Sequence, residues 1–334
     1  MNPLTLLLAI NGSETSLHAA NLCFALAKAA GAEVILQHVI NTEAARQLLP
    51  IRKPGLIGSG LHLQVYEDLI SSLRNVAEKL TTKCEALALG HGIDMKTFID
   101  EGDCLQAILQ RSAHCDLTVI GHSSLLERTL ESPGAMPRFI PSLAEQLVRA
   151  VRVPLLIVNG PVDHFNEGVI LSSATDVNLD YLRACKALLT ALGLKTRISF
   201  IADQLVDAEK STSEAIEKFL HDCPDLHDVS FDLREIRGET AGGPLKLWQR
   251  AGEKVNIDCK ESTLLIVPTR CMGPNSLTIF GAEPEQFVAE LDLPAVLIYP
   301  EDNVLSQAPS RVRSFTQKLS FAVEPAALPR RTDA

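Results

Sequence analysis

The chain has 334 residues, about twice the length of a typical single domain, which predicts two domains. Hydrophobic residues make up 46% and charged residues 22%, and this near-average usage excludes a disordered chain, a collagen-like repeat and a coiled coil. The formal net charge of −10 and the 4% aromatic content argue against nucleic acid as a partner, because phosphates require positive charge and exposed bases require aromatic stacking partners.

The sequence predicts a cytoplasmic protein that neither enters a membrane nor is exported. No apolar run reaches the roughly 18 residues that cross a bilayer, and strand-like sequence starts by Leu4 without a basic leader. The 8 cysteines form no Cys-x-x-Cys pair, which favours reduced thiols over disulfides or a zinc ribbon. Cys104, His114, Cys115 and His122 lie near one another, but their spacings match no known ligand pattern, so we expect no metal site.

Strand and helix patterns alternate along the first half. Residues 4–10 form a continuous apolar run, typical of a strand covered on both faces of a parallel sheet. Turn and cap residues at 11–14 begin a helix that Gly31 ends. The elements predicted after it are a strand at 33–40, a loop rich in Pro and Gly at 50–60, a helix at 61–89, a strand at 94–99, a helix at 104–113, a strand at 117–120, a helix at 142–151 and a strand at 154–158. This order predicts a doubly wound α/β layer with right-handed crossovers.

The pattern then repeats in the second half. A shift of 162 residues aligns 11–39 with 173–201 without a gap, and a shift of 140 aligns 154–158 with 294–298. The second half is therefore interpreted as a shorter copy of the first. The expected organisation is a first domain at 1–160, a linker at 161–167, a second domain at 168–300, and a tail or strand-like arm at 301–334.

A series of short motifs resembles the universal stress protein domain. They are Ala-Ile-Asn-Gly-Ser at 9–13, His-Val at 38–39, Glu-Gly-Asp at 101–103, Asp-Leu-Thr-Val-Ile-Gly at 116–121, Ser-Leu-Ala-Glu at 142–145 and Pro-Leu-Leu-Ile-Val at 154–158. The resemblance covers the first half well and the second half weakly, so the whole chain resembles a tandem universal stress protein. It implies two Rossmann-like domains, each a five-stranded, mainly parallel sheet with helices on both faces. Such domains commonly dimerise through their last strands, which implies that 154–158 and 294–298 pair within the chain as an intramolecular pseudo-dimer. A homodimer of the chain is left open.

Many members of that family bind ATP through Gly-x-x-Gly, nine residues and Gly-Ser/Thr, together with an Asp after the first strand. Glycines let the backbone approach the phosphates, and a helix start directs its N–H groups at them. By this resemblance Gly121 is the first glycine, Ser142 carries the terminal hydroxyl, and the Val39 main chain meets adenine. The resemblance therefore implies an adenine-nucleotide site in the first domain.

The first domain departs from this pattern at several positions. Ser124 replaces the second glycine, Pro141 the third and Asn11 the Asp, and 16 residues rather than nine separate Ser124 from Pro141. Pro141 has no N–H to offer a phosphate, although it is equally well interpreted as the first residue of a helix. Together the changes predict that a micromolar site becomes a millimolar one. Arg128 and Arg138 lie in the insertion, where Arg138 either contacts phosphate or belongs to a solvated loop.

The second half retains less of the pattern. At the family's spacing it carries Pro268, Cys271, Gly281 and Ala282, and Ser173 stands in the Asp position. One of three glycines survives and the terminal hydroxyl is absent, so we expect no nucleotide there. This half is interpreted as a support for the first half, or as a binder of something less charged.

The remaining motifs support no enzyme. The glycine-rich loop at 55–60 lacks the ending of a Walker motif, and is either a cover over the pocket or an ordinary surface turn. The sequence has no His-Glu-x-x-His, no Gly-x-Ser-x-Gly and no kinase signature. We therefore expect a stress-response regulatory or sensor module that requires no cofactor and binds ATP or another adenine nucleotide weakly. The alternatives are a scaffold or binder of another small molecule, and slow ATP hydrolysis or nucleotidyl transfer in the first half.

Overall fold

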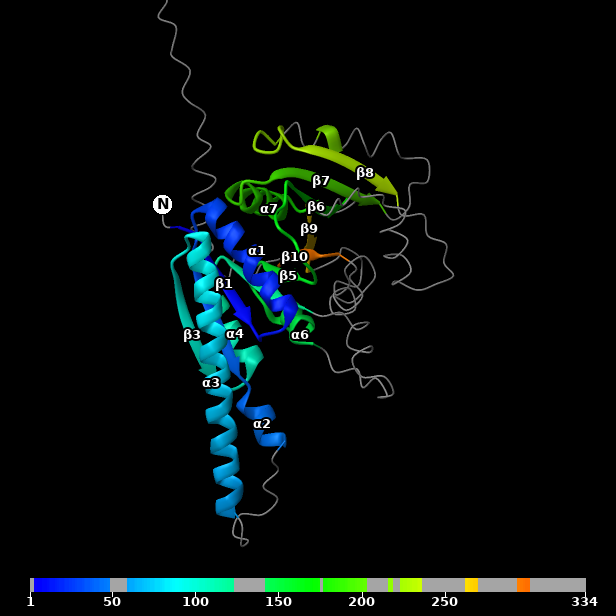
Figure 1. Ribbon diagram of the computed structural model, residues 1–334. Coiled ribbons are helices and arrows are strands. Elements are labelled where there is room, and N and C mark those ends of the chain that lie inside the picture. The colour runs from blue at the N-terminus through cyan, green and yellow to red at the C-terminus, as the bar shows by residue number, and fades with distance from the viewer. Residues whose placement is uncertain are drawn as a thin grey trace, which may run out of the picture.

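A computed structural model of the protein describes residues 3–48, 59–122, 142–174, 177–202, 216–218, 223–235, 262–269 and 293–300. These residues form one ten-stranded sheet with the spatial order β3-β2-β1-β4-β5-β10-β9-β6-β7-β8 (Figure 1). The strands are β1 Thr5–Ile10, β2 Glu33–Ile40, β3 Met95–Glu101, β4 Leu117–Gly121, β5 Leu155–Val158, β6 Glu167–Ser173, β7 Lys195–Ala202, β8 Ser230–Glu235, β9 Thr263–Pro268 and β10 Ala295–Tyr299.

The two halves of this sheet have the same strand order when each is read from its outer edge. The first runs β3-β2-β1-β4-β5 and the second β8-β7-β6-β9-β10, with parallel pairing inside each half. β1 and β6 therefore occupy equivalent places, and the bounds of β2 and β7 differ by the shift of 162 found in the sequence. The predicted α/β class with a mainly parallel sheet is confirmed.

The halves join through their last strands. β5 and β10 pair antiparallel, with Leu156 opposite Leu297 and Ile157 opposite Val296. All four side chains are buried, so the joint is a continuous part of the core. The predicted pairing of 154–158 with 294–298 within one chain is confirmed.

Helices cover both faces of the sheet. They are α1 Glu14–Ala30, α2 Thr42–Leu48, α3 Ser59–His91, α4 Cys104–Ser112, α6 Leu143–Ala150 and α7 Leu179–Ala191. α1, α3 and α7 share one hydrophobic core with one face of the sheet, and α4 and α6 share a second core with the other face. The first half of α3 extends past the ends of the strands beside α2 (Figure 1), where Ile40, Ala45, Ile70 and Ala77 form a third, small core.

Local signals explain the helix ends that position the site. Ser13 caps α1 by accepting a hydrogen bond from the Ser16 N–H at 3.2 Å. Gly31 ends the helix with a φ of +61° and donates its N–H to the Ala27 carbonyl, as its place in the sequence predicts. Asn41 accepts from the Ala44 N–H at 2.9 Å and starts α2, a helix that the sequence analysis missed.

The segment expected to be a linker at 161–167 is partly structured. The predicted linker overlaps β6, which begins at Glu167, and Val162 and Phe165 within it are buried. Val162 and Phe165 belong to the hydrophobic core that both halves of the sheet share. The loop at 51–58 and the tail at 301–334 lie outside the described residues.

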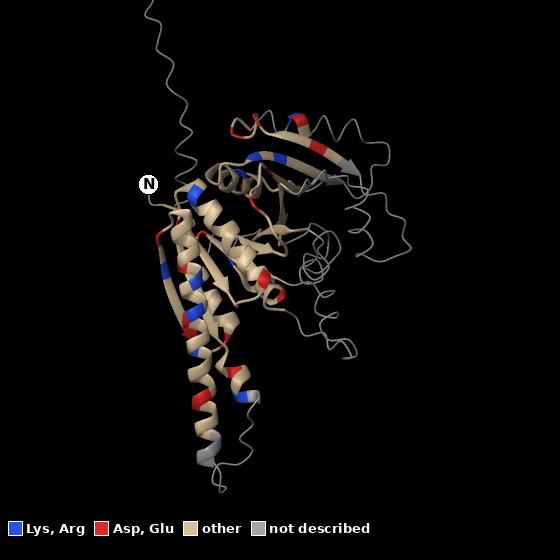
Figure 2. Cartoon of the chain, viewed as in Figure 1, with Lys and Arg blue, Asp and Glu red and all other residues tan. Residues whose placement is uncertain are grey.

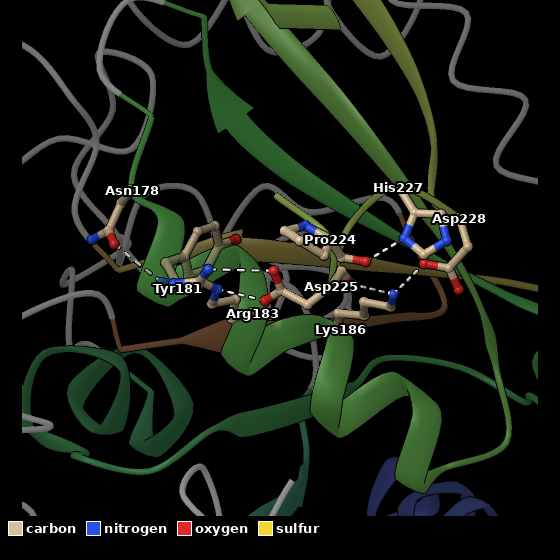
Figure 3. Close-up of polar contacts among 8 residues, drawn as sticks. All are labelled: Asn178, Tyr181, Arg183, Lys186, Pro224, Asp225, His227 and Asp228. Carbon is tan, nitrogen blue, oxygen red and sulfur yellow. Dashed lines mark hydrogen bonds and ion pairs between the residues drawn. The ribbon is translucent and has the colours of Figure 1, made fainter. Parts of the chain in front are cut away.

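In the second half, two ion pairs fix the turn at 223–229 to α7 (Figure 3). The Arg183 Nε lies 2.5 Å from Asp225 Oδ2, and Lys186 pairs with Asp228. The hydrogen bond from Arg183 holds the pKa of Asp225 below its ordinary value, and the hydrogen bond from Lys186 does the same for Asp228.

Over the described elements, positive and negative side chains are interspersed along α3 and β3 (Figure 2). No described helix is both long and apolar enough to cross a membrane.

Candidate functional site

A cavity of about 150 Å³ opens at the carboxyl ends of β1, β2 and β4. Its wall is completed by the first turn of α1, by α4 and by the start of α6. In parallel α/β sheets, ligands bind beyond the carboxyl ends of the strands, so this cavity lies where the fold places ligand sites. A cavity of this size has room for a small aromatic ring system and is smaller than the roughly 300 to 1,000 Å³ of drug-sized sites.

The structure brings four of the seven predicted site residues together around this cavity. Asn11, Val39, Gly121 and Ser142 all line it, although they lie on four different elements or loops. The other three, Ser124, Arg138 and Pro141, lie outside the described residues. The role of all seven in binding stays a prediction.

Asn11 stabilises the turn that leads into α1. Its Oδ1 accepts from the Ser13 N–H at 3.0 Å and from the Ser13 hydroxyl at 2.7 Å. Gly12 has a φ of +86°, and its N–H donates to the Ser16 hydroxyl at 3.2 Å. The exposed Asn11 side chain therefore sets the geometry of a helix start at the cavity edge.

Gly121 lies in close contact with that helix start. A β-carbon on Gly121 would lie 2.4 Å from the Ser16 nitrogen and 2.5 Å from the Thr15 carbonyl carbon, which no real contact allows. This glycine therefore lets the end of β4 approach the first turn of α1. The sequence analysis explained a glycine at this position by the close approach of a phosphate group. The packing of β4 against α1 is by itself enough to require a glycine here.

Ser142 is the N-cap of α6 in a complete capping box. Its hydroxyl accepts from the Glu145 N–H at 3.2 Å, and its own N–H donates to Glu145 Oε2 at 2.8 Å. The hydroxyl also lies 3.3 Å from His122 Nδ1. α6 begins at Leu143, directly after this cap, and Pro141 lies outside the described residues.

A partly buried polar network that the sequence analysis missed adjoins the cavity through Gln37, which lies in the cavity wall. It consists of Gln37, Asp100 and Arg111. The Gln37 amide nitrogen donates to Asp100 Oδ2 at 2.7 Å and to the Ala107 carbonyl at 3.2 Å. Arg111 donates to the same Asp100 oxygen at 2.7 Å, and its guanidinium lies 3.9 Å from the Phe98 ring centroid. The sequence signal that could have indicated this network is Gln37, a polar residue within the mostly apolar strand at 33–40.

Cys104 lines the cavity next to Val39. Its thiol lies 3.9 Å from the Val39 carbonyl oxygen, a weak contact. Burial, and then the neighbouring Asp103 carboxylate, raise the pKa of Cys104 above its ordinary value. The thiol is therefore protonated at neutral pH and is a poor nucleophile. Within the described ranges, no group of three His, Cys, Asp or Glu side chains is placed to hold a metal ion.

Comparison with known proteins agrees with this geometry. The model of the universal stress protein family matches residues 4–159. Residues 4–159 form a universal stress protein domain. The two described halves also resemble a universal stress protein from Archaeoglobus fulgidus DSM 4304, with a TM-score of 0.54, 15% identity, and coverage of 90% of this chain and 97% of that one. A functionally unknown protein from Pseudomonas aeruginosa PAO1 gives a TM-score of 0.51, 13% identity, and coverage of 95% and 97%. No curated protein matches the chain significantly.

These structural likenesses show the fold, and they extend over both halves of the sheet. All residues that line the cavity lie within the range 4–159 that the family model matches. The family match therefore covers the half of the chain that holds the cavity.

The second half differs at the position equivalent to Gly121. Counting from the strand pairs Leu6 with Leu117 and Gly168 with Leu264 places Pro268 there. α7 begins at Leu179, three residues later than the shift of 162 places it from the start of α1 at Glu14.

The remaining second-half predictions are only partly within the described structure. Ser173 aligns with Asn11 and is the last residue of β6, whereas Asn11 follows the last residue of β1. Cys271, Gly281 and Ala282 lie outside the described residues. The expected absence of nucleotide in this half stays a prediction.

Proposed function

We propose that the protein is a regulatory or sensor module of the stress response that binds an adenine nucleotide weakly in the cavity of its universal stress protein domain. The observation that carries the proposal is the convergence of Asn11, Val39, Gly121 and Ser142 on one cavity at the carboxyl ends of parallel strands. Two helix starts, those of α1 and α6, border the same cavity and favour a negatively charged group.

The weakness of binding follows from the groups that are already engaged. The Ser142 N–H and hydroxyl both serve the capping box, and the Asn11 amide oxygen serves the turn before α1. Pro141 offers no N–H of its own. Each missing charge-assisted donor lowers the affinity for phosphate by about 10- to 150-fold, so a millimolar dissociation constant is expected.

The test is a titration of the purified protein with ATP, AMP and adenosine, followed by ligand-observed NMR, together with mass spectrometry of any ligand retained after purification. The expected result is saturable binding of ATP in the millimolar range, weakened in Asn11→Ala. Asn21→Ala, an exposed change on α1, is the matched control. Absence of binding up to about 10 mM ATP overturns the proposal.

A second candidate is a binder of a small uncharged molecule, or a scaffold. The small volume of the cavity favours it, because a whole nucleotide requires more room than about 150 Å³. Binding of adenosine with no gain from phosphates would support this candidate. Turnover of ATP that is lost in Asn11→Ala would instead support slow hydrolysis.

A further inference from the structure

β3 is an edge strand of the ten-stranded sheet, and no described element lies on its outer side (Figure 1). Both faces of the strand are covered by helices. On one face the Arg74 Nε of α3 lies 2.6 Å from Glu101 Oε1, and on the other the Arg111 guanidinium of α4 lies 3.9 Å from the Phe98 ring centroid. The open part of β3 is therefore its backbone edge.

The backbone groups of β3 point alternately toward β2 and toward this open edge. The Gly102 N–H donates to the Ile40 carbonyl of β2 at 3.0 Å, so the groups of the even-numbered residues from 96 to 100 also point toward β2. The groups of the odd-numbered residues from 95 to 101 point outward. An edge with outward N–H and carbonyl groups is a template for pairing with another strand.

The side chains at this edge are arranged symmetrically about one residue. Phe98 and Ile99 are 38% and 37% exposed, which is unusual for large apolar side chains in a strand. Lys96 and Asp100 lie two residues before and two residues after Phe98, on the same face of the strand. The Lys96 side chain is 71% exposed, and its ion pair with Glu33 of β2 spans 3.5 Å. Opposite charges thus flank an exposed aromatic ring at equal distances.

An antiparallel second copy of β3 would bring these charges together. Opposed side chains must lie on one face of the sheet, so a two-fold axis has to pass through a residue that pairs with itself. With the axis at Phe98, Lys96 of each copy lies opposite Asp100 of the other, and the two phenyl rings face each other. An axis one residue earlier would oppose Asp94 to Asp100, and one residue later would oppose Phe98 to Asp100. The charge pattern therefore selects one register.

We propose that two copies of the chain associate through antiparallel pairing of β3 about a two-fold axis at Phe98. Asp100 is prepared for this contact, because Gln37 and Arg111 both donate to its Oδ2 and leave Oδ1 for the Lys96 ammonium of the second copy. Exposed ion pairs add little affinity, so these pairs set the register. The outward backbone hydrogen bonds and the pair of phenyl rings supply the attraction. The proposal does not depend on ligand binding.

The first test is sedimentation velocity of the full chain over a range of concentrations. Pairing of one strand edge lies at the small end of protein interfaces, so a dissociation constant of about 10 to 100 µM is expected. Thr97→Pro removes an outward N–H without touching a bond to β2, and should raise this constant at least about tenfold. Thr97→Val is the matched control, because it loses the same hydroxyl bond to Glu85 but keeps the outward N–H.

The second test measures the register with two cysteine variants. In Phe98→Cys the two new side chains oppose each other across the axis, with β-carbons about 4.5 to 5.5 Å apart, close enough for a disulfide after a small adjustment. In Lys96→Cys, on the same face, the two cysteines lie four residues apart along the joint, or roughly 13 Å, which no disulfide spans. Mild oxidation and peptide mass spectrometry should give a 98–98 crosslink between copies and no 96–96 crosslink.

The outcomes decide the proposal in either direction. A wild type that stays monomeric up to about 200 µM overturns it and leaves the edge to a strand of another protein. A dimer that Thr97→Pro does not weaken overturns it as well, because the two copies then meet at another surface. Equal crosslinking of the two cysteine variants contradicts the register. Should Thr97→Pro fail to fold, the cysteine variants decide.

Discussion

A β-carbon on Gly121 at the end of β4 would lie 2.4 Å from the backbone nitrogen of Ser16 in the first turn of α1. The strand end and the helix start are therefore in backbone contact, at the edge of the cavity that Gly121 helps to line. The same glycine serves the packing of the fold and the shape of the site.

Gly121→Ala should destabilise the protein by about 1 to 3 kcal/mol, because the new methyl group must displace the first turn of α1. Urea unfolding followed by circular dichroism measures the change. Gly90→Ala is the matched control: Gly90 is exposed in α3, and a β-carbon there meets nothing within 4 Å. Helix propensity predicts that this control is neutral or slightly stabilising. Equal effects of the two substitutions would show that the close contact is not rigid.

The architecture followed from the sequence, because hydrophobic runs, caps and an internal repeat all indicated the same α/β layer. The shift of 162 reproduces the bounds of β2 and β7. The sequence alone could not tell why a glycine stands at position 121. A bound phosphate and a closely packed helix both require a residue without a side chain.

Ser142→Ala should weaken α6 by about 1 kcal/mol, because both hydrogen bonds of the capping box depend on the N-cap geometry. Faster amide hydrogen exchange over residues 143–150 is the expected readout. Ser142→Asn provides the control, since Asn caps helices as well as Ser does. Unchanged exchange in Ser142→Ala would mean that packing of Leu147 and Val148 alone holds the helix.

The ion pairs at 223–229 predict an acid-sensitive contribution to stability. Arg183 and Lys186 lower the pKa values of Asp225 and Asp228, so the folded state binds fewer protons than the unfolded state in acid. The contribution is complete above the unfolded pKa of about 3.9 and is lost as the pH falls through the lowered folded values.

Arg183→Met should therefore lower the urea midpoint at pH 7 and reduce the further loss of stability as the pH falls below about 4. Lys83→Met, an exposed change on α3, is the charge-matched control and should keep the wild-type pH dependence. If Arg183→Met retains the full acid-induced loss, the pair with Asp225 is not its source.

The partly buried polar network was beyond sequence reasoning for a different reason. Gln37 in an apolar run is a visible signal, but its partners Asp100 and Arg111 lie 63 and 74 positions further along the chain. The contact forms only because β3 pairs with β2 and α4 crosses that face of the sheet.

Cys104 should react with iodoacetamide more slowly than a free thiol at pH 8, because burial and the Asp103 carboxylate raise its pKa and leave less thiolate. It should still react before Cys23, whose pKa burial raises to about 12. Peptide mass spectrometry after timed alkylation measures each rate. Adenosine should protect Cys104, since this residue lines the cavity that is proposed to bind an adenine nucleotide.

The cause of the slow reaction can be separated from simple burial. Asp103→Asn keeps the N-cap of α4, because Asn accepts the Gln106 N–H as Asp does, but it removes the charge that raises the Cys104 pKa. Alkylation of Cys104 at pH 8 should therefore become faster. Asp94→Asn, at the opposite end of β3, should leave the rate unchanged. If both variants match wild type, access to the cavity and not the thiolate fraction limits the reaction, and the protection by adenosine then measures closure of the cavity directly.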